Sequence, residues 1–149
     1  MNLSSLKPAS AYAVNLGVKA IVYGPAGSGK TPIINTAPRP VMLACEPGLL
    51  SMRGSTVPTF IGATAKSIDE FFDWLFSSAE TKNFDTVAVD SISQMCEIYL
   101  EEALTGKSKG GNKVHGLVAY GNMATEVLKP IERLYFMRYK HTYLIAKIE

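Results

Sequence analysis

The sequence predicts an α/β fold: a three-layer α/β/α sandwich built on a mainly parallel central sheet. Short apolar runs rich in β-branched residues alternate along the chain with longer amphipathic segments. Glycine, proline and small polar residues separate these runs, as they do at the ends of strands and helices. Strands that alternate with helices form parallel sheets, because each helix carries the chain back to the same end of the sheet. A chain of 149 residues has the size of one such domain.

The first strand is expected over 18–23, after an irregular lead-in over 1–17. Its residues are mostly apolar, and Gly24-Pro25 ends it. A glycine-rich loop follows, and a helix is expected over 29–35. Pro32 would lie in the first turn of this helix, where a missing N–H group costs little.

The remaining elements follow from the same patterns. Further strands are expected over 41–45, 86–90 and 142–146, and 58–61 is a candidate for a short additional strand. Helices are expected from a capping box at Ser67–Glu70, over 92–104, and over 117–136 with an interruption near Pro130. We therefore assign 18–149 to a single core domain.

The composition is that of an ordinary globular protein, and it excludes several classes. No apolar run approaches the roughly 20 residues that a membrane-spanning helix needs. The first residues lack the continuous apolar stretch of a signal peptide. Cys45 and Cys96 have no metal-ligand spacing around them, so we expect free thiols in a reducing compartment. These features predict a cytoplasmic protein without a membrane partner.

The charges are distributed unevenly along the chain. Residues 1–65 carry five basic and one acidic side chain, 66–102 carry two basic and nine acidic, and 103–149 carry eight basic and three acidic. The last third is therefore the part that would attract a polyanion. A solvated surface with balanced charges explains the same pattern, and charge alone does not separate the two interpretations.

One segment carries a specific chemical signal. It matches the pattern G-x-x-x-x-G-K-[ST] in full, between a predicted strand and a predicted helix, and consists of Gly24, Pro25, Ala26, Gly27, Ser28, Gly29, Lys30 and Thr31. Glycines let consecutive backbone N–H groups curl around phosphate oxygens. Lys30 would reach the β- and γ-phosphates, and the Thr31 hydroxyl would bind Mg²⁺. The sequence thus predicts a phosphate-binding loop for a nucleoside triphosphate.

Asp90 is the candidate for the second magnesium ligand. It ends the apolar strand over 86–90, about 60 residues after the phosphate-binding loop, where such proteins place this carboxylate. Asp85 is its competitor, but it precedes the strand and would lie at the wrong end of the sheet. Ser91 follows Asp90 where many proteins with this loop place a catalytic glutamate, so the hydrolytic base must come from elsewhere.

Glu46 is the best candidate for that base. It follows the strand over 41–45, on the rim where ligands of open α/β sheets bind. A carboxylate there can orient the attacking water and take its proton. The alternative is an acidic loop residue that caps a turn at Pro47-Gly48, and the residues alone leave both interpretations open.

The joint pattern resembles the phage-type RecA-like ATPases, a family of stand-alone RecA cores that includes phage nucleotide-binding and single-strand annealing proteins. The resemblance covers about 19–146 and rests on four segments: Tyr23–Thr31, Ala37–Pro40, Glu46–Leu49 and Val89–Ile92. It implies an ATPase that uses ATP and Mg²⁺, acts on single-stranded DNA in recombination or strand annealing, and assembles into a ring or filament. It also implies that Glu46 activates water, that a single-strand-binding protein is a partner, and that a phage protein would work in the bacterial cytoplasm.

The resemblance further assigns a DNA-contacting loop to the segment after the helix over 92–104. That segment holds Lys107, Lys109 and Lys113, whose side chains could follow a phosphate backbone on a flexible glycine-rich loop. An ordinary solubilising loop is the alternative.

The chain also departs from the family pattern. Ala44-Cys45 stands where the family often has an acidic residue, and the sequence stops soon after the strand over 142–146. A fifth core strand normally covers the first strand, so we expect either a truncated core or a partner subunit at that edge. Lys147 lies where related proteins place a polar γ-phosphate sensor.

Two other functions fit the same loop. A small-molecule phosphotransferase would need clustered arginines to clamp the transferred phosphoryl group. The four arginines, Arg39, Arg53, Arg133 and Arg138, are scattered in the sequence, which counts against this function. A nucleotide-gated binding module, in which ATP acts as a switch with little hydrolysis, is the other alternative.

Overall fold

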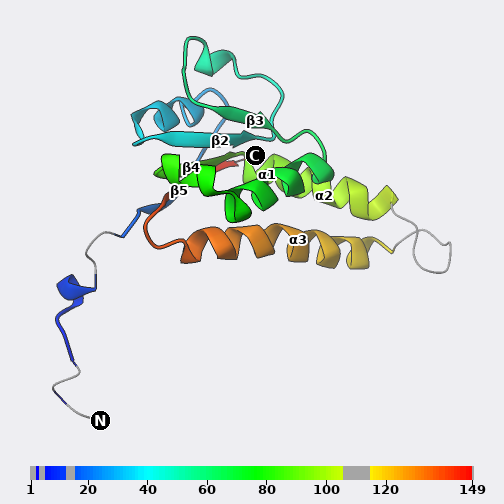
Figure 1. Cartoon of the computed structure of the whole chain (residues 1–149). Coiled ribbons are helices and arrows are strands. Elements are labelled where there is room, and N and C mark those ends of the chain that lie inside the picture. The colour runs from blue at the N-terminus through cyan, green and yellow to red at the C-terminus, as the bar shows by residue number, and fades with distance from the viewer. Residues whose placement is uncertain (1–2, 4–5, 13–15, 106–114, 149) are drawn as a thin grey trace.

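The computed structural model describes residues 3, 6–12, 16–105 and 115–148, and their strands form one sheet (Figure 1). The sheet has five strands in the order β1-β5-β4-β2-β3, and every pairing is parallel. The strands are β1 (Lys19–Gly24), β2 (Pro40–Ala44), β3 (Thr59–Ile61), β4 (Thr86–Asp90) and β5 (His141–Lys147). The predicted α/β fold with a parallel sheet is confirmed, and the candidate strand over 58–61 is present as β3 at one edge.

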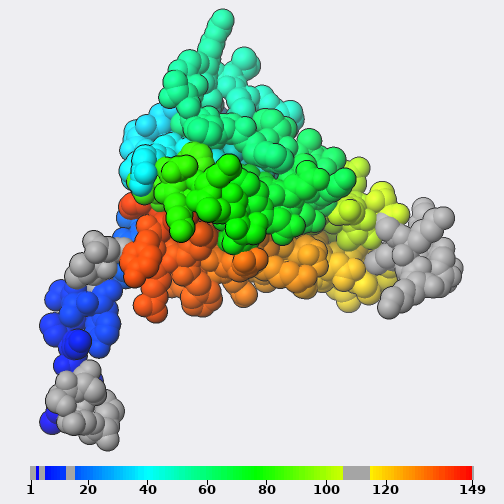
Figure 2. All heavy atoms as spheres, in the orientation of Figure 1, coloured from blue at the N-terminus to red at the C-terminus, as the bar shows by residue number. Residues whose placement is uncertain are grey.

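Three α-helices, α1 (Ala65–Ser77), α2 (Ile92–Thr105) and α3 (Gly116–Phe136), pack on one face of the sheet. Two 3₁₀ helices, η3 (Thr31–Thr36) and η4 (Leu50–Met52), pack on the other face. Two more 3₁₀ helices, η2 (Ala9–Ala11) and η5 (Ala79–Asn83), lie elsewhere in the described chain. Figure 2 shows the segment around η2 projecting from the body. Within the described ranges, no helix combines the length and apolar character that a bilayer crossing requires.

The central strands β2 and β4 are buried on both faces, which explains why they are continuous apolar runs in the sequence. Alternate side chains point to opposite faces of a strand. Leu43 and Val89 therefore pack in a cluster with the α-helices. Met42 and Ala88 pack in a second cluster with Ile34 of η3. These two clusters fix the orientation of the strands whose ends carry the polar residues discussed below.

The helix predicted over 29–35 is wrong in type and extent. The segment after the glycine-rich loop is the short 3₁₀ helix η3, which begins at Thr31. The N–H of Ile33 donates to the carbonyl of Lys30, and the N–H of Ala37 donates to the carbonyl of Ile34. Pro32 has no N–H to donate to a longer helical ladder, and Ala37 is extended, so the segment ends after six residues.

Two further helices differ from the prediction, one in where it begins and one in its continuity. Helix α1 begins at Ala65 and not at Ser67, because Thr64 is the N-cap: Thr64 and Ser67 form the capping box, each side chain bonded to the backbone N–H of the other residue. Helix α3 continues through Pro130, which is buried against the core. Proline has a helical φ, but inside a helix it lacks the N–H for the i→i−4 bond and its ring crowds the carbonyl of residue i−4. The helix accommodates Pro130 with its side chain buried.

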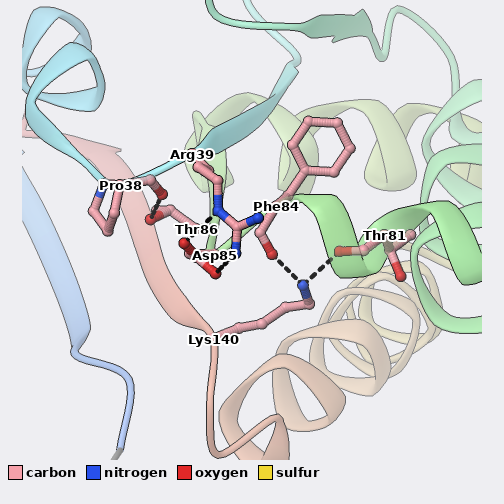
Figure 3. A network of polar contacts seen from close by, with 7 residues as sticks. All are labelled: Pro38, Arg39, Thr81, Phe84, Asp85, Thr86 and Lys140. Atoms are coloured by element: carbon pink, nitrogen blue, oxygen red, sulfur yellow. Dashed lines mark hydrogen bonds and ion pairs between the residues drawn. The ribbon is translucent and has the colours of Figure 1, made fainter.

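Structural hydrogen bonds gather at the amino ends of the strands. Arg39 binds Asp85 through two nitrogens, at 2.7 and 2.6 Å. Figure 3 shows this pair beside Lys140, whose ammonium donates to the carbonyls of Thr81 and Phe84. These contacts tie together the chain segments at this end of the sheet.

Two more clusters complete the same end of the fold. The Lys19 ammonium donates to the carbonyls of Leu134, Met137 and Lys140, at 2.8 to 3.0 Å, and so caps the carboxyl end of α3. On the same helical face of the sheet, Trp74 of α1 packs edge-on against Phe84, with ring centroids 6.0 Å apart. The contacts described at the amino ends of the strands therefore stabilise the fold. A functional site is expected at the carboxyl ends.

Candidate functional site

The carboxyl ends of four strands meet around one cavity. In an open parallel sheet, ligands bind at this edge, because the loops there diverge and leave a crevice. The cavity has a volume of about 450 Å³. Its lining consists of residues 26–32 of the glycine-rich loop together with Glu46, Gly48, Leu50, Ser51, Asp90 and Lys147. The structure therefore brings the candidates from β1, β2 and β4 to one place, although they lie far apart in the sequence.

The glycine-rich loop adopts a conformation that depends on two of its glycines. Gly27 and Gly29 have φ angles of 75° and 81°, in the region that residues with a Cβ rarely adopt. A Cβ on either residue would meet no atom within 4 Å, so the requirement comes from the backbone conformation and not from crowding. The open space next to both glycines leaves their backbone accessible to a phosphate group.

The two functional side chains of the loop make different contacts. The Lys30 ammonium donates to the carbonyls of Gly24 and Pro25, both at 2.7 Å, and so lies across the mouth of the loop. The Thr31 hydroxyl donates to Oδ2 of Asp90 at 2.6 Å. This second contact connects the loop after β1 to the end of β4, across the intervening strand β5.

Asp90 is almost fully buried, with 4% of its surface exposed. Burial raises the pKa of its carboxyl group, and the nearby Glu46 carboxylate raises it further; the Thr31 hydroxyl and the charges of Lys30 and Lys147 act in the opposite direction. A buried carboxylate beside a hydroxyl oxygen is a donor set that suits a hard cation.

Mg²⁺ fits this donor set. It binds proteins through one or two oxygen ligands and keeps waters and substrate phosphates as its other ligands. No cluster of three or more His, Cys, Asp or Glu side chains suited to a metal occurs in the part of the chain that the structure describes. Thr31 and Asp90, joined by the 2.6 Å hydrogen bond, are the residues that would hold such an ion.

Asp85, the competing carboxylate, lies at the opposite end of β4. It pairs with Arg39 at the amino edge of the sheet, and the hydrogen bond from Arg39 lowers the pKa of Asp85. This position removes Asp85 from the site.

Glu46 follows β2 and pairs with Lys147, the last residue of β5. Its Oε1 lies 3.3 Å from the Lys147 Nζ, and the two side chains are 29% and 43% exposed. The backbone N–H groups of Cys45 and Glu46 both donate to the carbonyl of Asp90, at 2.7 and 3.4 Å. The chain leaving β2 is thereby held against the end of β4, which places Glu46 at the cavity.

The loop after β2 contributes lining residues that the sequence did not predict. Gly48, Leu50 and Ser51 line the cavity together with the glycine-rich loop. The only signal for them is their position directly after Glu46 and Pro47, at the carboxyl end of a predicted strand. Their residue types are common in ordinary loops.

The three candidate DNA-contacting residues Lys107, Lys109 and Lys113 lie outside the described residues. His115, at the end of the same segment, is the N-cap of α3, where its side chain accepts a hydrogen bond from the N–H of Leu117. The structure therefore gives His115 a structural contact, and the DNA-contacting role of the three lysines stays a prediction.

A comparison with protein-family models shows to which family the chain belongs. A family model described as an AAA domain matches residues 16–149, which include every strand and all residues that line the cavity. The chain belongs to the AAA domain family. This family consists of P-loop nucleoside triphosphatases, so membership implies that the AAA domain described here binds a nucleoside triphosphate and hydrolyses it. No curated protein sequence matches the chain.

Membership of this family does not test the finer predictions that were made from the sequence. It does not bear on recombination, on DNA, on a phage source or on a RecA-like subgroup. For this AAA domain, the choice of ATP and the roles of individual residues are therefore matters of proposal.

Proposed function

We propose that this AAA domain hydrolyses ATP with magnesium, with Glu46 as the base that activates water. The observation that carries the proposal is the convergence of Glu46, Asp90 and the glycine-rich loop on a single cavity. In this proposal the loop and Lys30 bind the phosphates, while Thr31 and Asp90 hold the magnesium ion, whose charge would offset that of the phosphate oxygens.

The reaction transfers the terminal phosphoryl group to water. The water oxygen forms a bond to the γ-phosphorus as the bond from that phosphorus to the β–γ bridging oxygen breaks. Glu46 takes the proton of the attacking water, and the electrons of the broken bond stay on the leaving ADP. The products are ADP and inorganic phosphate.

A matched pair of variants tests the roles of Glu46 and Lys30. Glu46→Gln should bind ATP and lose turnover by about 10²- to 10⁴-fold, because the amide cannot accept the proton. Lys30→Ala should lose ATP binding. Glu132→Gln, on the exposed surface of α3, is the control for the same chemical change outside the cavity. Binding is measured by calorimetry and turnover by phosphate release. Full turnover in Glu46→Gln would show that another group is the base.

The proposed activity includes stimulation by single-stranded DNA, in the manner of the RecA-like ATPases that the sequence resembles. Supporting it are the joint motif pattern and the excess of basic residues in the last third of the chain. Turnover should rise when single-stranded DNA is added. Neutralising Lys107, Lys109 and Lys113 together should weaken DNA binding and reduce its salt dependence. An unchanged affinity and salt slope would remove the lysines from the interface.

The same assays decide between this function and the two alternatives. Turnover that ignores DNA but responds to a small acceptor would indicate a phosphotransferase, whereas binding without turnover would indicate a nucleotide-gated module. The position of the arginines counts against the phosphotransferase. All four lie in the described part of the chain, and none lines the cavity.

A further inference from the structure

The turn between α3 and β5, at the amino end of the sheet, leaves three aromatic rings in contact with solvent. We call residues 135–139 the aromatic turn. Within it, Tyr135, Phe136 and Tyr139 are 65%, 74% and 76% exposed. An aromatic ring removes a large apolar area from water when it is buried, so folding normally favours its burial. Exposed apolar groups that gather in one place indicate a surface for a partner.

The backbone of the aromatic turn is held by several contacts, although its side chains point outward. The Lys19 ammonium donates to three carbonyls around the end of α3, at 2.8 to 3.0 Å. The Gly17 N–H donates to the carbonyl of Arg138 at 2.7 Å, and a Cβ on Gly17 would lie 2.0 Å from the carbonyl oxygen of Lys140. The Lys140 ammonium is bound to two further carbonyls (Figure 3). The rings therefore stand on a preorganised backbone, which lowers the entropy cost of binding a partner.

Two cavities adjoin at the aromatic turn. One has a volume of about 400 Å³ and is lined by the turn and by Lys19. The other has a volume of about 510 Å³ and is lined by the turn and by Lys82. Phe136 and Arg138 line both cavities, so the exposed rings border two neighbouring hollows and not a flat surface.

The charged side chains around the two cavities are mainly basic. The one acidic side chain that lines them, Asp85, is bonded to Arg39 at 2.6 Å. Lys82 and Arg138 are exposed, and neither side chain forms an ion pair with a residue in the described ranges. This surface therefore attracts a negatively charged partner. The basic lining residues are Lys19, Lys82, Arg138 and Lys140.

A single strand of DNA uses both the rings and the charges. Its bases are flat and stack on aromatic side chains, and its phosphates attract exposed cations. A DNA duplex keeps the faces of its bases stacked inside, and an apolar protein surface has no use for the positive charge. The combination of exposed rings and cations thus favours single-stranded DNA over both.

We propose that the aromatic turn binds single-stranded DNA, with Tyr135 and Tyr139 stacking on bases and Arg138 contacting the phosphates. This inference rests on the proposed function. It adds a DNA contact at the end of the sheet opposite the nucleotide cavity, made by residues that sequence reasoning did not select.

The test measures the binding of a fluorescein-labelled oligothymidylate by anisotropy. Tyr135→Ala and Tyr139→Ala should each weaken binding by about fivefold or more, whereas Tyr139→Phe keeps the ring and should stay within about twofold of the wild type. Arg138→Gln should reduce the salt slope of log K by about 0.7. Leu128→Ala is the matched control, because it truncates another exposed apolar side chain of α3 that lines neither cavity.

A strand of the same length without bases gives a result that a merely structural role of the tyrosines would not produce. It keeps the phosphates but has nothing to stack, so the wild type and Tyr139→Ala should bind it with equal affinity. Arg138→Gln should weaken the binding of both strands. ATP turnover without DNA should match the wild type in every variant, because the aromatic turn lies outside the nucleotide cavity.

The remaining outcomes would overturn the inference in different ways. If the wild type bound no single-stranded DNA, the DNA part of the proposed function would fail together with it. If the wild type bound the strand and the tyrosine variants bound it equally well, only the aromatic turn would be excluded. An equal loss for both strands in Tyr139→Ala would exclude stacking, and tighter binding of the matching RNA would exclude DNA as the partner. A lower sedimentation coefficient in Tyr139→Ala, with DNA binding unchanged, would identify an interface between copies of the chain instead.

Discussion

Replacing Asp90 with asparagine should stabilise the protein while it removes magnesium-dependent nucleotide binding. Asp90 is 4% exposed and accepts a hydrogen bond from Thr31 at 2.6 Å. Asparagine has the same shape, and its amide oxygen can accept the same hydrogen bond. The substitution therefore removes a buried negative charge and leaves the packing unchanged. A buried carboxylate that binds a cation destabilises the fold when the cation is absent, because its charge is then only partly compensated.

The gain follows from the burial of Asp90. Replacing a partly compensated buried carboxylate by a neutral, hydrogen-bonded isostere should raise the free energy of unfolding by about 1–2 kcal/mol. For a chain of 149 residues, that corresponds to an increase in Tm of about 2–8 °C.

The pH dependence has a definite sign. Burial raises the pKa of Asp90 in the folded protein above the ordinary value of 3.8. Below 3.8 the carboxyl group is protonated in both states, so the variant gains nothing there. The gain grows as pH rises from 3.8 through the raised folded-state pKa, and it is complete above that value.

Thermal unfolding followed by calorimetry, at pH 7 and near pH 3.5, measures the effect, and titration with Mg-ATP measures the loss of binding. Asp85→Asn provides a control of opposite sign, because Arg39 lowers the pKa of Asp85 and the substitution weakens that ion pair. If Asp90→Asn melted at the wild-type temperature or below it, with its circular dichroism unchanged, the reasoning from burial would be refuted.

Three other predictions concern residues outside the nucleotide cavity. Lys19→Met removes the Lys19 donor from the carbonyls at the end of α3 and should lower the free energy of unfolding in urea by about 2–4 kcal/mol. A decrease of less than about 0.5 kcal/mol would contradict the capping role. Tyr99→Phe removes the 2.6 Å hydrogen bond to Asp69 and should cost about 1–2 kcal/mol, whereas an equal cost in the Asp69→Ala background would show that the pair does not interact. Burial raises the pKa of the Cys45 thiol to about 12, so iodoacetamide at pH 8 should leave Cys45 unmodified in the native protein and alkylate it in urea, and rapid native labelling would speak against its burial.

The sequence predicted the elements of the fold well where a local pattern encodes them. The strands over 41–45 and 86–90 are buried on both faces, and such strands are continuous apolar runs that any reader can find. The phosphate-binding loop was predictable because its glycines serve the backbone of the loop itself. Asp90 and Glu46 were predictable as members of the site from their places at the ends of strands, since parallel strands deliver their carboxyl ends to one edge.

Contacts between distant residues could not be predicted in the same way. Glu46 and Lys147 form an ion pair although a hundred residues separate them, and no local pattern marks either one as the partner of the other. The same holds for Lys19, whose partners are carbonyl groups of α3 and leave no trace in residue types. The start of α1 was missed because Thr64 and Ser67 fit the capping pattern with serine, and not glutamate, in its third position.

The aromatic cluster at the amino end of β4 contains an intrinsic fluorescence probe of folding. Trp74 is the only tryptophan in the chain, and its ring packs against Phe84, just before β4, while its indole N–H donates to Glu80 at 3.4 Å. Asp90 ends β4 on the nucleotide side, six residues after Phe84 and therefore about 20 Å further along the extended chain. The tryptophan emission should therefore shift when the helical layer separates from the sheet and stay constant when a nucleotide binds. Unfolding can be followed in this intrinsic signal while an extrinsic dye on the nucleotide reports occupancy.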